Sequence, residues 1–227
     1  VVVLPQLSKH IQSKKISKIH LIQNKALELS LFLTLPASAA LLIASEEIIS
    51  ALFGYGSFDQ ESAINSGKAL YYFALGLPAF SLIKVFSSFF FANHDTKIPF
   101  YISLFSVLTN IVISISYFNE IGFIIIPIAT TISSWLNAIL LFAFLKNRDL
   151  FSFNNIFLVR FVKIIIASLL MAIFFNFLIT YFKYELAFNQ NIKSFYLILS
   201  VILSLLFYLF VSYWIKAFKM SDIKLKY

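Results

Sequence analysis

The sequence predicts an all-α, polytopic membrane protein with six transmembrane helices. Hydrophobic residues make up 60% of the 227 residues, charged residues only 12%, and 28 residues are Phe. Soluble domains contain about 45–50% apolar and about 25% charged residues, so a water-soluble core of this size could not hide so much apolar surface. The mean hydropathy of +0.90 agrees with this composition. We therefore expect lipid to be the solvent of the chain.

Six stretches have the length and composition of membrane-spanning helices. Five of them lack Asp, Glu, Lys and Arg, and the sixth, 69–93, is interrupted only by Lys84. About 20 apolar residues cross the hydrocarbon core as a helix, which satisfies its own backbone groups in lipid. Pro36, Pro78 and Pro127 lie inside these stretches, as proline does more often in membrane helices than in soluble ones. In chain order the predicted spans are 29–45, 69–93, 98–119, 121–145, 164–182 and 194–215.

The basic residues between the spans predict an orientation. The segments on one side carry 14 Lys and Arg, whereas those on the other side carry 3. The positive-inside rule places the more basic side in the cytoplasm, so both ends of the chain are expected there. The basic side comprises 1–28, 94–97, 146–163 and 216–227, and the other side comprises 46–68, 120 and 183–193.

The composition and motifs exclude several classes of function. The net charge of +8 comes from short basic islands between apolar runs, which suit anionic lipid headgroups better than nucleic acid. The chain has no Cys, and it lacks an HExxH motif, a paired-carboxylate spacing and a Gly-rich phosphate loop. The adjacent acids Glu46 and Glu47 end the first span, where we expect them to be solvated. The sequence therefore predicts neither an enzyme nor a bound cofactor or metal.

Two short polar segments border the spans. Residues 94–97, within FANHDTKIP, predict a tight turn between the second and third spans, with Asp95 or Thr96 capping the next helix. Pro99 suits the first turn of that helix. The N-terminal segment 1–28 mixes Ile with five Lys, which fits either a basic cytoplasmic loop or an interfacial amphipathic helix.

Charged residues at or inside the spans are candidates for the path of a transported substrate. Lys84 lies about ten residues from the 94–97 turn, which is about 15 Å at helical rise. An ionisable side chain at that depth is costly and usually faces a cavity or a partner, so we favour a functional role over snorkelling. Glu28 begins the first span, and Lys25 precedes it by three residues, a spacing that permits a helical pair. A surface pair is the simplest interpretation of Glu28 and Lys25.

Neutral polar residues inside the third and fourth spans form a second set of candidates. Asn110 and Ser114 are one helical turn apart in the third span, and Thr130 and Thr131 lie in the fourth. Side chains of this kind commonly join membrane helices through hydrogen bonds. They could also line a cation or solute site, and the sequence leaves both interpretations open.

Motifs spread over residues 1–145 carry a family resemblance. They include an LP-x-LSK opening, a G-x-F after the first span and a GLP-x-x-x-x-x-K run that ends at Lys84. FANHDTKIP matches an aromatic-Ala-x-x-Asp-Thr-x-x-Pro pattern, and GFIIIPIATTISSWLNAILL (122–141) continues the likeness. In these features the chain resembles the MurJ/MviN family of lipid II flippases, in the multidrug/oligosaccharidyl-lipid/polysaccharide exporter superfamily.

The resemblance implies an architecture of fourteen helices in two six-helix lobes followed by two C-terminal helices. The chain opens with VVVLPQLSKH and without Met, so we expect a part of a longer protein whose spans nine to fourteen are present here. By this likeness 1–28 is a cytoplasmic segment and 29–145 holds four helices of the second lobe. Residues 146–227 then hold the two C-terminal helices with a cytoplasmic tail. The N-terminal portion of the same protein is an expected partner.

The resemblance implies transport rather than catalysis. Family members move lipid II, the lipid-linked peptidoglycan precursor, from the cytoplasmic to the periplasmic leaflet of the bacterial inner membrane for cell-wall synthesis. Another exporter of the superfamily and a non-transporting membrane scaffold are the alternatives. The Phe-rich spans 164–182 and 194–215 would contribute a groove for the undecaprenyl tail. Asn110 and Thr130 or Thr131 match positions where some members bind a cation, but Ser114 stands where an acid would serve better.

Overall fold

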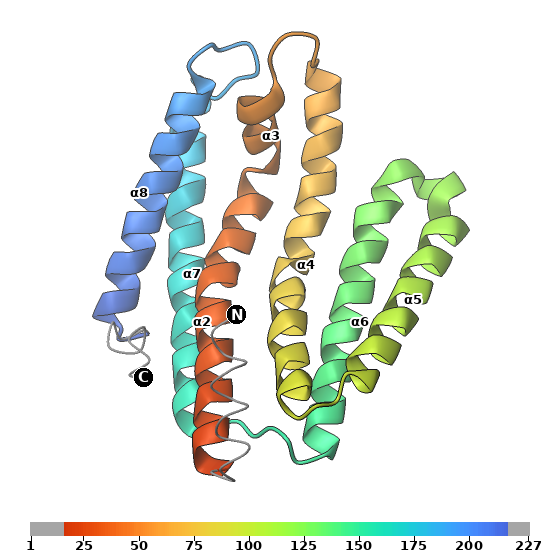
Figure 1. Ribbon diagram of the computed structural model, residues 1–227. Helices are drawn as coiled ribbons and strands as arrows, with labels where there is room; N and C mark the ends of the chain where they lie inside the picture. The colour runs from red at the N-terminus through yellow and green to blue at the C-terminus, as the bar shows by residue number, and fades with distance from the viewer. Residues whose placement is uncertain (1–15, 218–227) are drawn as a thin grey trace.

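The computed structural model describes residues 16–217, which form an all-α molecule (Figure 1). Six of the helices are long, and α3 is a short helix that follows α2 almost directly. A 3-10 turn, η1 (Gly122–Ile124), connects the third long helix to the fourth. The α-helices are α2 (Ile16–Ile43), α3 (Ser45–Phe53), α4 (Gln60–Ala92), α5 (Lys97–Ile121), α6 (Ile125–Asn147), α7 (Asn155–Tyr181) and α8 (Lys193–Trp214).

All six predicted spans are helical over most of their length, although the first, 29–45, is broken at Ala44 between α2 and α3. The helices extend beyond the predicted spans at several ends. Five segments of the described residues are long and apolar enough to cross a membrane. One of these, Lys97–Asn147, contains both α5 and α6 in 51 residues. The two helices lie side by side and pack against each other rather than continuing in line (Figure 1). The chain thus has the helices of a multi-pass membrane protein.

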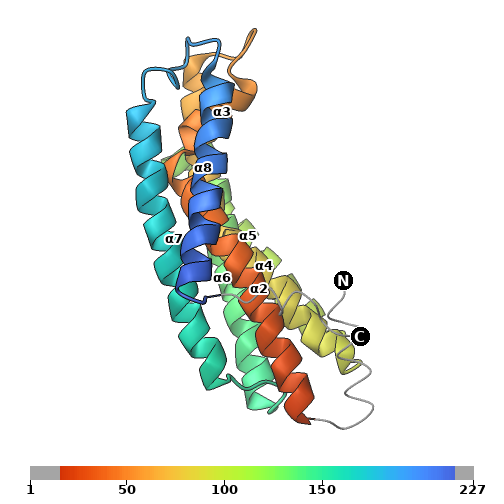
Figure 2. The ribbon, with the colours of Figure 1, turned by 90° about the vertical axis from the view of Figure 1, so that its left-hand side faces the viewer.

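The long helices run alternately up and down and form a curved row (Figures 1 and 2). From one edge to the other the order is α8, α7, α2, α4, α6 and α5, and each helix packs against the next in the row. The lower end in Figure 1 holds the α4–α5 turn and the α6–α7 connection, and the upper end holds α3 and the α7–α8 connection. This alternation agrees with the two sets of loops that the sequence separates by charge.

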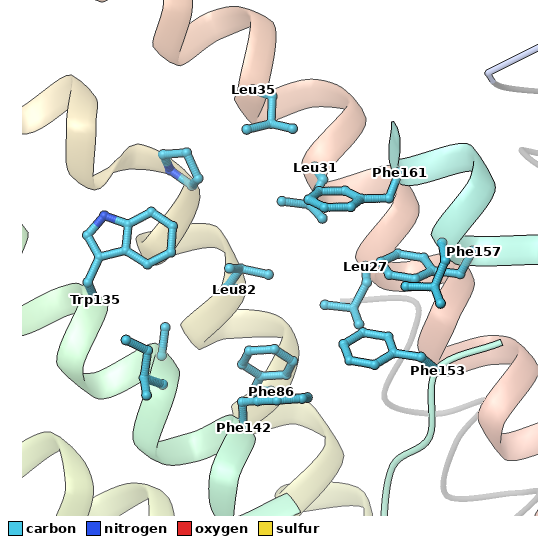
Figure 3. Close-up of a pocket in the computed structure, with 14 residues that line it drawn as sticks. Leu27, Leu31, Leu35, Leu82, Phe86, Trp135, Phe142, Phe153, Phe157 and Phe161 are labelled. Carbon is cyan, nitrogen blue, oxygen red and sulfur yellow. The ribbon is translucent and has the colours of Figure 1, made fainter. Parts of the chain in front are cut away.

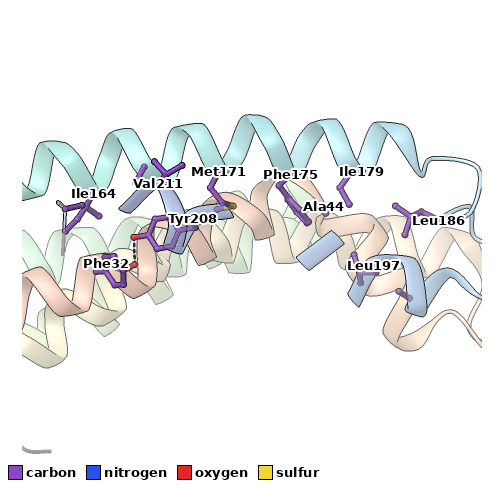
Figure 4. Packing of buried hydrophobic residues seen from close by; sticks show 13 residues of the cluster. Phe32, Ala44, Ile164, Met171, Phe175, Ile179, Leu186, Leu197, Tyr208 and Val211 are labelled. Atoms are coloured by element: carbon purple, nitrogen blue, oxygen red, sulfur yellow. Dashed lines mark hydrogen bonds between the residues drawn. The ribbon is translucent and has the colours of Figure 1, made fainter. Parts of the chain in front are cut away.

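Two clusters of buried apolar side chains stabilise the row. The first joins α2, α4, α5 and α6 with the start of α7, and Phe89 and Phe90 of α4 are fully buried in it. The second joins α2, α3, α7 and α8 around Ile164, Phe175 and Tyr208 (Figure 4). Most other apolar side chains on the outer surfaces are exposed, as lipid-facing side chains are in a membrane protein.

The predicted turn between α4 and α5 is present, and Asp95 is its capping residue. The Oδ1 atom of Asp95 accepts hydrogen bonds from the backbone N–H groups of Lys97 (3.1 Å) and Ile98 (3.2 Å). Thr96 occupies the N-cap position but makes no side-chain capping bond. Asp95 Oδ2 also accepts from Arg148 at 2.8 Å, which ties this turn to the end of α6.

Three helices begin well before their predicted spans, and one of them is α4, which starts at Gln60 rather than at 69. Residues 16–28 are the first turns of α2, continuous with the first span, while residues 1–15 of the basic segment lie outside the described residues. Helix α7 begins at Asn155, whose preceding residue Asn154 accepts a capping hydrogen bond from the N–H of Ile156. The basic residues of 155–163 are therefore helical rather than part of a loop.

Candidate functional site

A seam of buried polar side chains joins the lower part of α2 to the segment between α6 and α7. The Nε2 atom of Gln23 donates to the carbonyl of Leu150 at 2.9 Å. Asn24 donates to the carbonyl of Ser152 at 2.8 Å, and its Oδ1 accepts from the N–H of Asn154 at 3.2 Å. Both α2 side chains are buried, so these bonds fix a connection that would otherwise carry unsatisfied backbone groups.

Glu28 continues this seam one turn further along α2. Its carboxylate accepts two hydrogen bonds from Nη1 of Arg160 in α7, at 2.8 and 3.1 Å. Glu28 is 4% exposed. The surface interpretation of Glu28 is therefore wrong: the carboxylate is buried against α7, where Arg160 is a partner that the sequence did not indicate. A buried charge needs such a counter-charge, because its desolvation costs several kcal/mol.

Arg160 is a residue that sequence reasoning missed. It was counted among the basic residues of a cytoplasmic segment, 146–163, but it lies in the second turn of α7. Because charged residues are rare in these helices, the presence of one Arg and one Glu could have indicated that the two form a pair. Their separation of 132 positions gives no local pattern that identifies the partner.

An apolar cavity of about 370 Å³ lies between the lower halves of the helices (Figure 3). Its wall is formed by side chains of α2, α4, α6, the α6–α7 connection and the first turns of α7. The lining includes Leu27, Leu31, Trp135, Phe142, Phe153, Phe157 and Phe161. This cavity is not the groove that the family resemblance implied for 164–182 and 194–215, because neither α8 nor the later part of α7 lines the cavity.

Lys84 lies on α4 away from this cavity. Leu82 and Phe86 line the cavity on either side of it in sequence. Residues two apart on a helix point in nearly opposite directions, so Lys84 faces the other side of α4. Its side chain is exposed in the described part of the chain. Because the Lys84 side chain is exposed, it can contact a partner or water.

The structure brings together two of the polar residues predicted inside the third and fourth spans, Asn110 and Thr130. The Nδ2 atom of Asn110 donates to Thr130 Oγ1 at 3.0 Å and approaches Ser133 Oγ at 3.4 Å. Ser114 Oγ is buried and has no hydrogen-bond partner among the described residues. Thr131 is turned away from this group, because its hydroxyl donates to the carbonyl of Tyr72 in α4 at 2.6 Å.

The chemistry of this polar group suits helix packing better than a metal. The side chains supply neutral hydroxyl and amide groups, and residues 16–217 contain no cluster of three or more His, Cys, Asp or Glu. A cation held by Asn110, Ser114 and Thr130 would lack a carboxylate to balance its charge. Hydrogen bonding between α5 and α6 accounts for Asn110 and Thr130, and a cation site stays a prediction.

At the upper end, Lys193 forms a second buried polar contact that the sequence did not indicate. Its ammonium donates to the carbonyls of Gly54 (2.7 Å) and Phe188 (2.6 Å) and lies over the rings of Tyr55 and Phe188. Lys193 is 1% exposed. The contact joins the connection after α3 to the connection before α8. A hydrogen bond of 2.6 Å between the Ser194 and Tyr55 hydroxyls reinforces it.

The acid pair after the first span divides between two environments. Glu46 is exposed, as predicted, but Glu47 is half-buried. Burial raises the pKa of the Glu47 carboxyl above its ordinary value, with Glu46 adding repulsion and Lys183 partly opposing the shift. Ionised Glu47 is therefore a local cost to the fold at neutral pH.

Comparison with known proteins identifies relatives for most of the chain. The family described as "Lipid II flippase MurJ" matches residues 1–197. A probable lipid II flippase MurJ of Rhizobium meliloti (strain 1021) is 39% identical over 171 residues, covering 75% of this chain and 32% of the relative. A lipid II flippase MurJ of Thermosipho africanus (strain TCF52B) is 28% identical over 206 residues, covering 91% of this chain and 39% of the relative.

A solved structure, "Lipid II flippase MurJ, inward closed conformation", is also similar. It superposes with a TM-score of 0.73 and 27% sequence identity, covering 93% of this chain and 41% of that one. The chain thus spans about a third of the length of the curated relatives that it matches. The family match includes the motifs at 52–100 and 122–141 and ends just inside α8. The chain belongs to the MurJ family of lipid II flippases.

Proposed function

We propose that this chain supplies helices of the second lobe and the C-terminal helix pair of a protein that translocates lipid II. The family match over residues 1–197 is the observation that carries the proposal. In such a transporter two lobes rock around a site near the membrane midplane and expose it to one face at a time. The substrate moves from the cytoplasmic to the periplasmic leaflet of the bacterial inner membrane, for peptidoglycan synthesis.

The partner of these helices is the remainder of the protein. The chain covers 32–39% of the two relatives described above, and α5 at the edge of the row exposes large apolar side chains along its length. These include Tyr101, Phe105, Leu108, Val112 and Ile115. Lipid and the helices of the N-terminal portion both suit such a surface.

Lys84 is the residue that we assign to the substrate path. It is exposed on the side of α4 opposite the apolar cavity, and a hydrated cationic side chain can hold a pyrophosphate group through charge-assisted hydrogen bonds. Glu28 is not assigned to this path, since it is buried against Arg160, and Lys25 stays a prediction. The apolar cavity suits a hydrocarbon chain, and the undecaprenyl tail of the substrate has that chemistry.

In the orientation that we propose, six membrane crossings leave both ends of the chain on the same side, the cytoplasmic one. The charge difference between the loops supports this orientation. Cysteines introduced at Ser57 and Asn189, both exposed at the upper end, should react with an impermeant thiol reagent in intact spheroplasts. A cysteine at the exposed Asn147 of the lower end should react only after lysis. The reverse pattern would contradict the orientation.

A chimera tests the transport function itself. The chain would replace the matching segment of the Rhizobium meliloti relative in cells depleted of their own flippase. We expect growth to be restored, and Lys84→Ala to reduce lipid II flipping at normal protein abundance while Lys84→Arg retains part of it. A chimera that inserts normally but restores no flipping would instead favour another exporter or a scaffold. Full activity of the Lys84→Ala chimera would remove Lys84 from the substrate path.

A further inference from the structure

Pro36 in α2 and Pro78 in α4 each deprive one backbone carbonyl of its helical donor. Proline has no N–H, so the carbonyl four residues earlier loses its hydrogen bond within the helix. The carbonyls concerned are those of Phe32 and Ala74, both in buried residues. An unsatisfied backbone group is costly at membrane depth, where no water can replace the lost donor.

Each of these two carbonyls accepts a hydrogen bond from a hydroxyl on a neighbouring helix. Tyr208 of α8 donates to the Phe32 carbonyl at 2.8 Å, as the dashed line in Figure 4 shows. Ser38 of α2 donates to the Ala74 carbonyl at 2.6 Å. Both donors are buried, with exposures of 2% and 6%. The hydroxyls therefore replace the two donors that the prolines remove.

The two replacements are connected in series. Ser38 lies two residues after Pro36 on the same helix. Its position therefore depends on the course of α2 past Pro36, where the ladder of helical hydrogen bonds is interrupted and the Tyr208 hydroxyl fills the gap. A helix with a missing bond bends more easily at that point, and a donor from a neighbour restrains the bend. Helix α8 thus acts on α2, and α2 acts on α4.

Helix α6 holds the same part of α4 from the other side. Thr131 donates to the Tyr72 carbonyl at 2.6 Å, and Nε1 of Trp135 donates to the Leu75 carbonyl at 3.0 Å. A Cβ added to Gly76 would come within 2.9 Å of the Thr131 hydroxyl oxygen, so the two helices approach closely here. The interrupted stretch of α4 is therefore fixed between the Ser38 hydroxyl of α2 and two donors of α6.

We propose that Tyr208 and Ser38 are positioning residues that fix the course of α2 and α4 at their prolines and link α8 to α4. The proposal concerns how the helices are held, and its test needs no transport measurement. It assigns the C-terminal helix a role beyond covering the bundle: its tyrosine sets the shape of the helix that carries Lys84.

The test is a set of double-mutant cycles on the unfolding temperature of the 227-residue chain in detergent micelles. Tyr208→Phe removes only a hydroxyl and should lower the unfolding temperature by about 2–4 °C. In a Pro36→Ala background the restored N–H at position 36 supplies the Phe32 carbonyl, so Tyr208→Phe should then change the temperature by less than about 1 °C. Likewise, Ser38→Ala should lower the unfolding temperature in the wild-type background and should change it by less than about 1 °C in the Pro78→Ala background, where the restored N–H supplies the Ala74 carbonyl.

The crossed pairs are the matched controls. Tyr208→Phe in the Pro78→Ala background, and Ser38→Ala in the Pro36→Ala background, should keep most of their effect. Equal effects in both proline backgrounds would overturn the assignment of donors to gaps. Tyr208→Phe combined with Ser38→Ala should lower the temperature by less than the sum of the single changes, and strict additivity would overturn the link between the two sites.

Hydrogen exchange gives a second measurement that needs no proline substitution. In the Tyr208→Phe chain, amides that follow Pro36 in α2 and Pro78 in α4 should exchange faster, whereas those of α5 should not change. Faster exchange in both helices supports the series connection. Unchanged exchange in α4 would refute it.

Discussion

Removal of Arg160 should be among the most destabilising single changes in this chain. Arg160→Ala takes from the Glu28 carboxylate, which is 4% exposed, the guanidinium that now donates to it at 2.8 and 3.1 Å. Breaking a buried ion pair by deleting one member typically costs about 3–5 kcal/mol, because the remaining charge stays desolvated. The pair also fastens α7 to α2, so its loss should loosen the C-terminal helices.

The chain contains a matched control for this change. Arg148 pairs with Asp95 at the same 2.8 Å, but the Arg148 side chain is 51% exposed. Exposed pairs contribute about 0–1 kcal/mol, so Arg148→Ala should cost little although the geometry is equally short. Denaturation of the detergent-solubilised chain, followed by circular dichroism, would compare the two variants under the same conditions.

A double substitution separates charge from packing. Glu28→Leu with Arg160→Met removes both charges and should recover most of the stability that Arg160→Ala loses, since replacing a buried pair by apolar residues is often neutral. The reasoning fails if Arg160→Ala and Arg148→Ala cost the same, or if the double variant is no more stable than Arg160→Ala.

Three further changes test other parts of the structure. Glu47→Gln should stabilise the chain at neutral pH, because the folded state holds the Glu47 pKa above its ordinary value of 4.5 and so opposes ionisation. The gain in stability should vanish as the pH falls below 4.5, where the carboxyl is protonated in both states. Glu46→Gln, which changes the exposed neighbour, is the control. Thermal unfolding between pH 4 and 8 would show it, and a pH-independent gain would contradict the burial argument. Asp95→Ala should cost about 0.5–2 kcal/mol through the lost cap of α5, and it would speak against the cap if unfolding were unchanged. Lys193→Met should leave two carbonyls at the upper end without their donor, costing about 1–3 kcal/mol and increasing proteolysis after Gly54; unaltered proteolysis would argue against the clamp.

Local features of the sequence determined the helices. Apolar runs of about 20 residues can satisfy their backbone in lipid only as helices, so the runs at 98–119 and 194–215 predicted α5 and α8 with small errors at their ends. The α4–α5 turn could also be predicted from the local sequence, because the Asp95 carboxylate caps N–H groups only two and three residues away. The motifs also predicted the family, which the match over residues 1–197 confirmed.

The tertiary structure alone decided which polar groups are partners. The contacts of Glu28 with Arg160, Gly54 with Lys193 and Phe32 with Tyr208 join positions 132, 139 and 176 residues apart. Hydropathy and helical periodicity describe which residues share a face of one helix, but they hold no information on which helix lies opposite. In lipid every polar group must find a partner in that neighbour. The packing order of α8, α7, α2, α4 and α6 therefore determined which polar groups are partners. It also determined the burial of Glu28, the position of the apolar cavity and the donors at the two prolines.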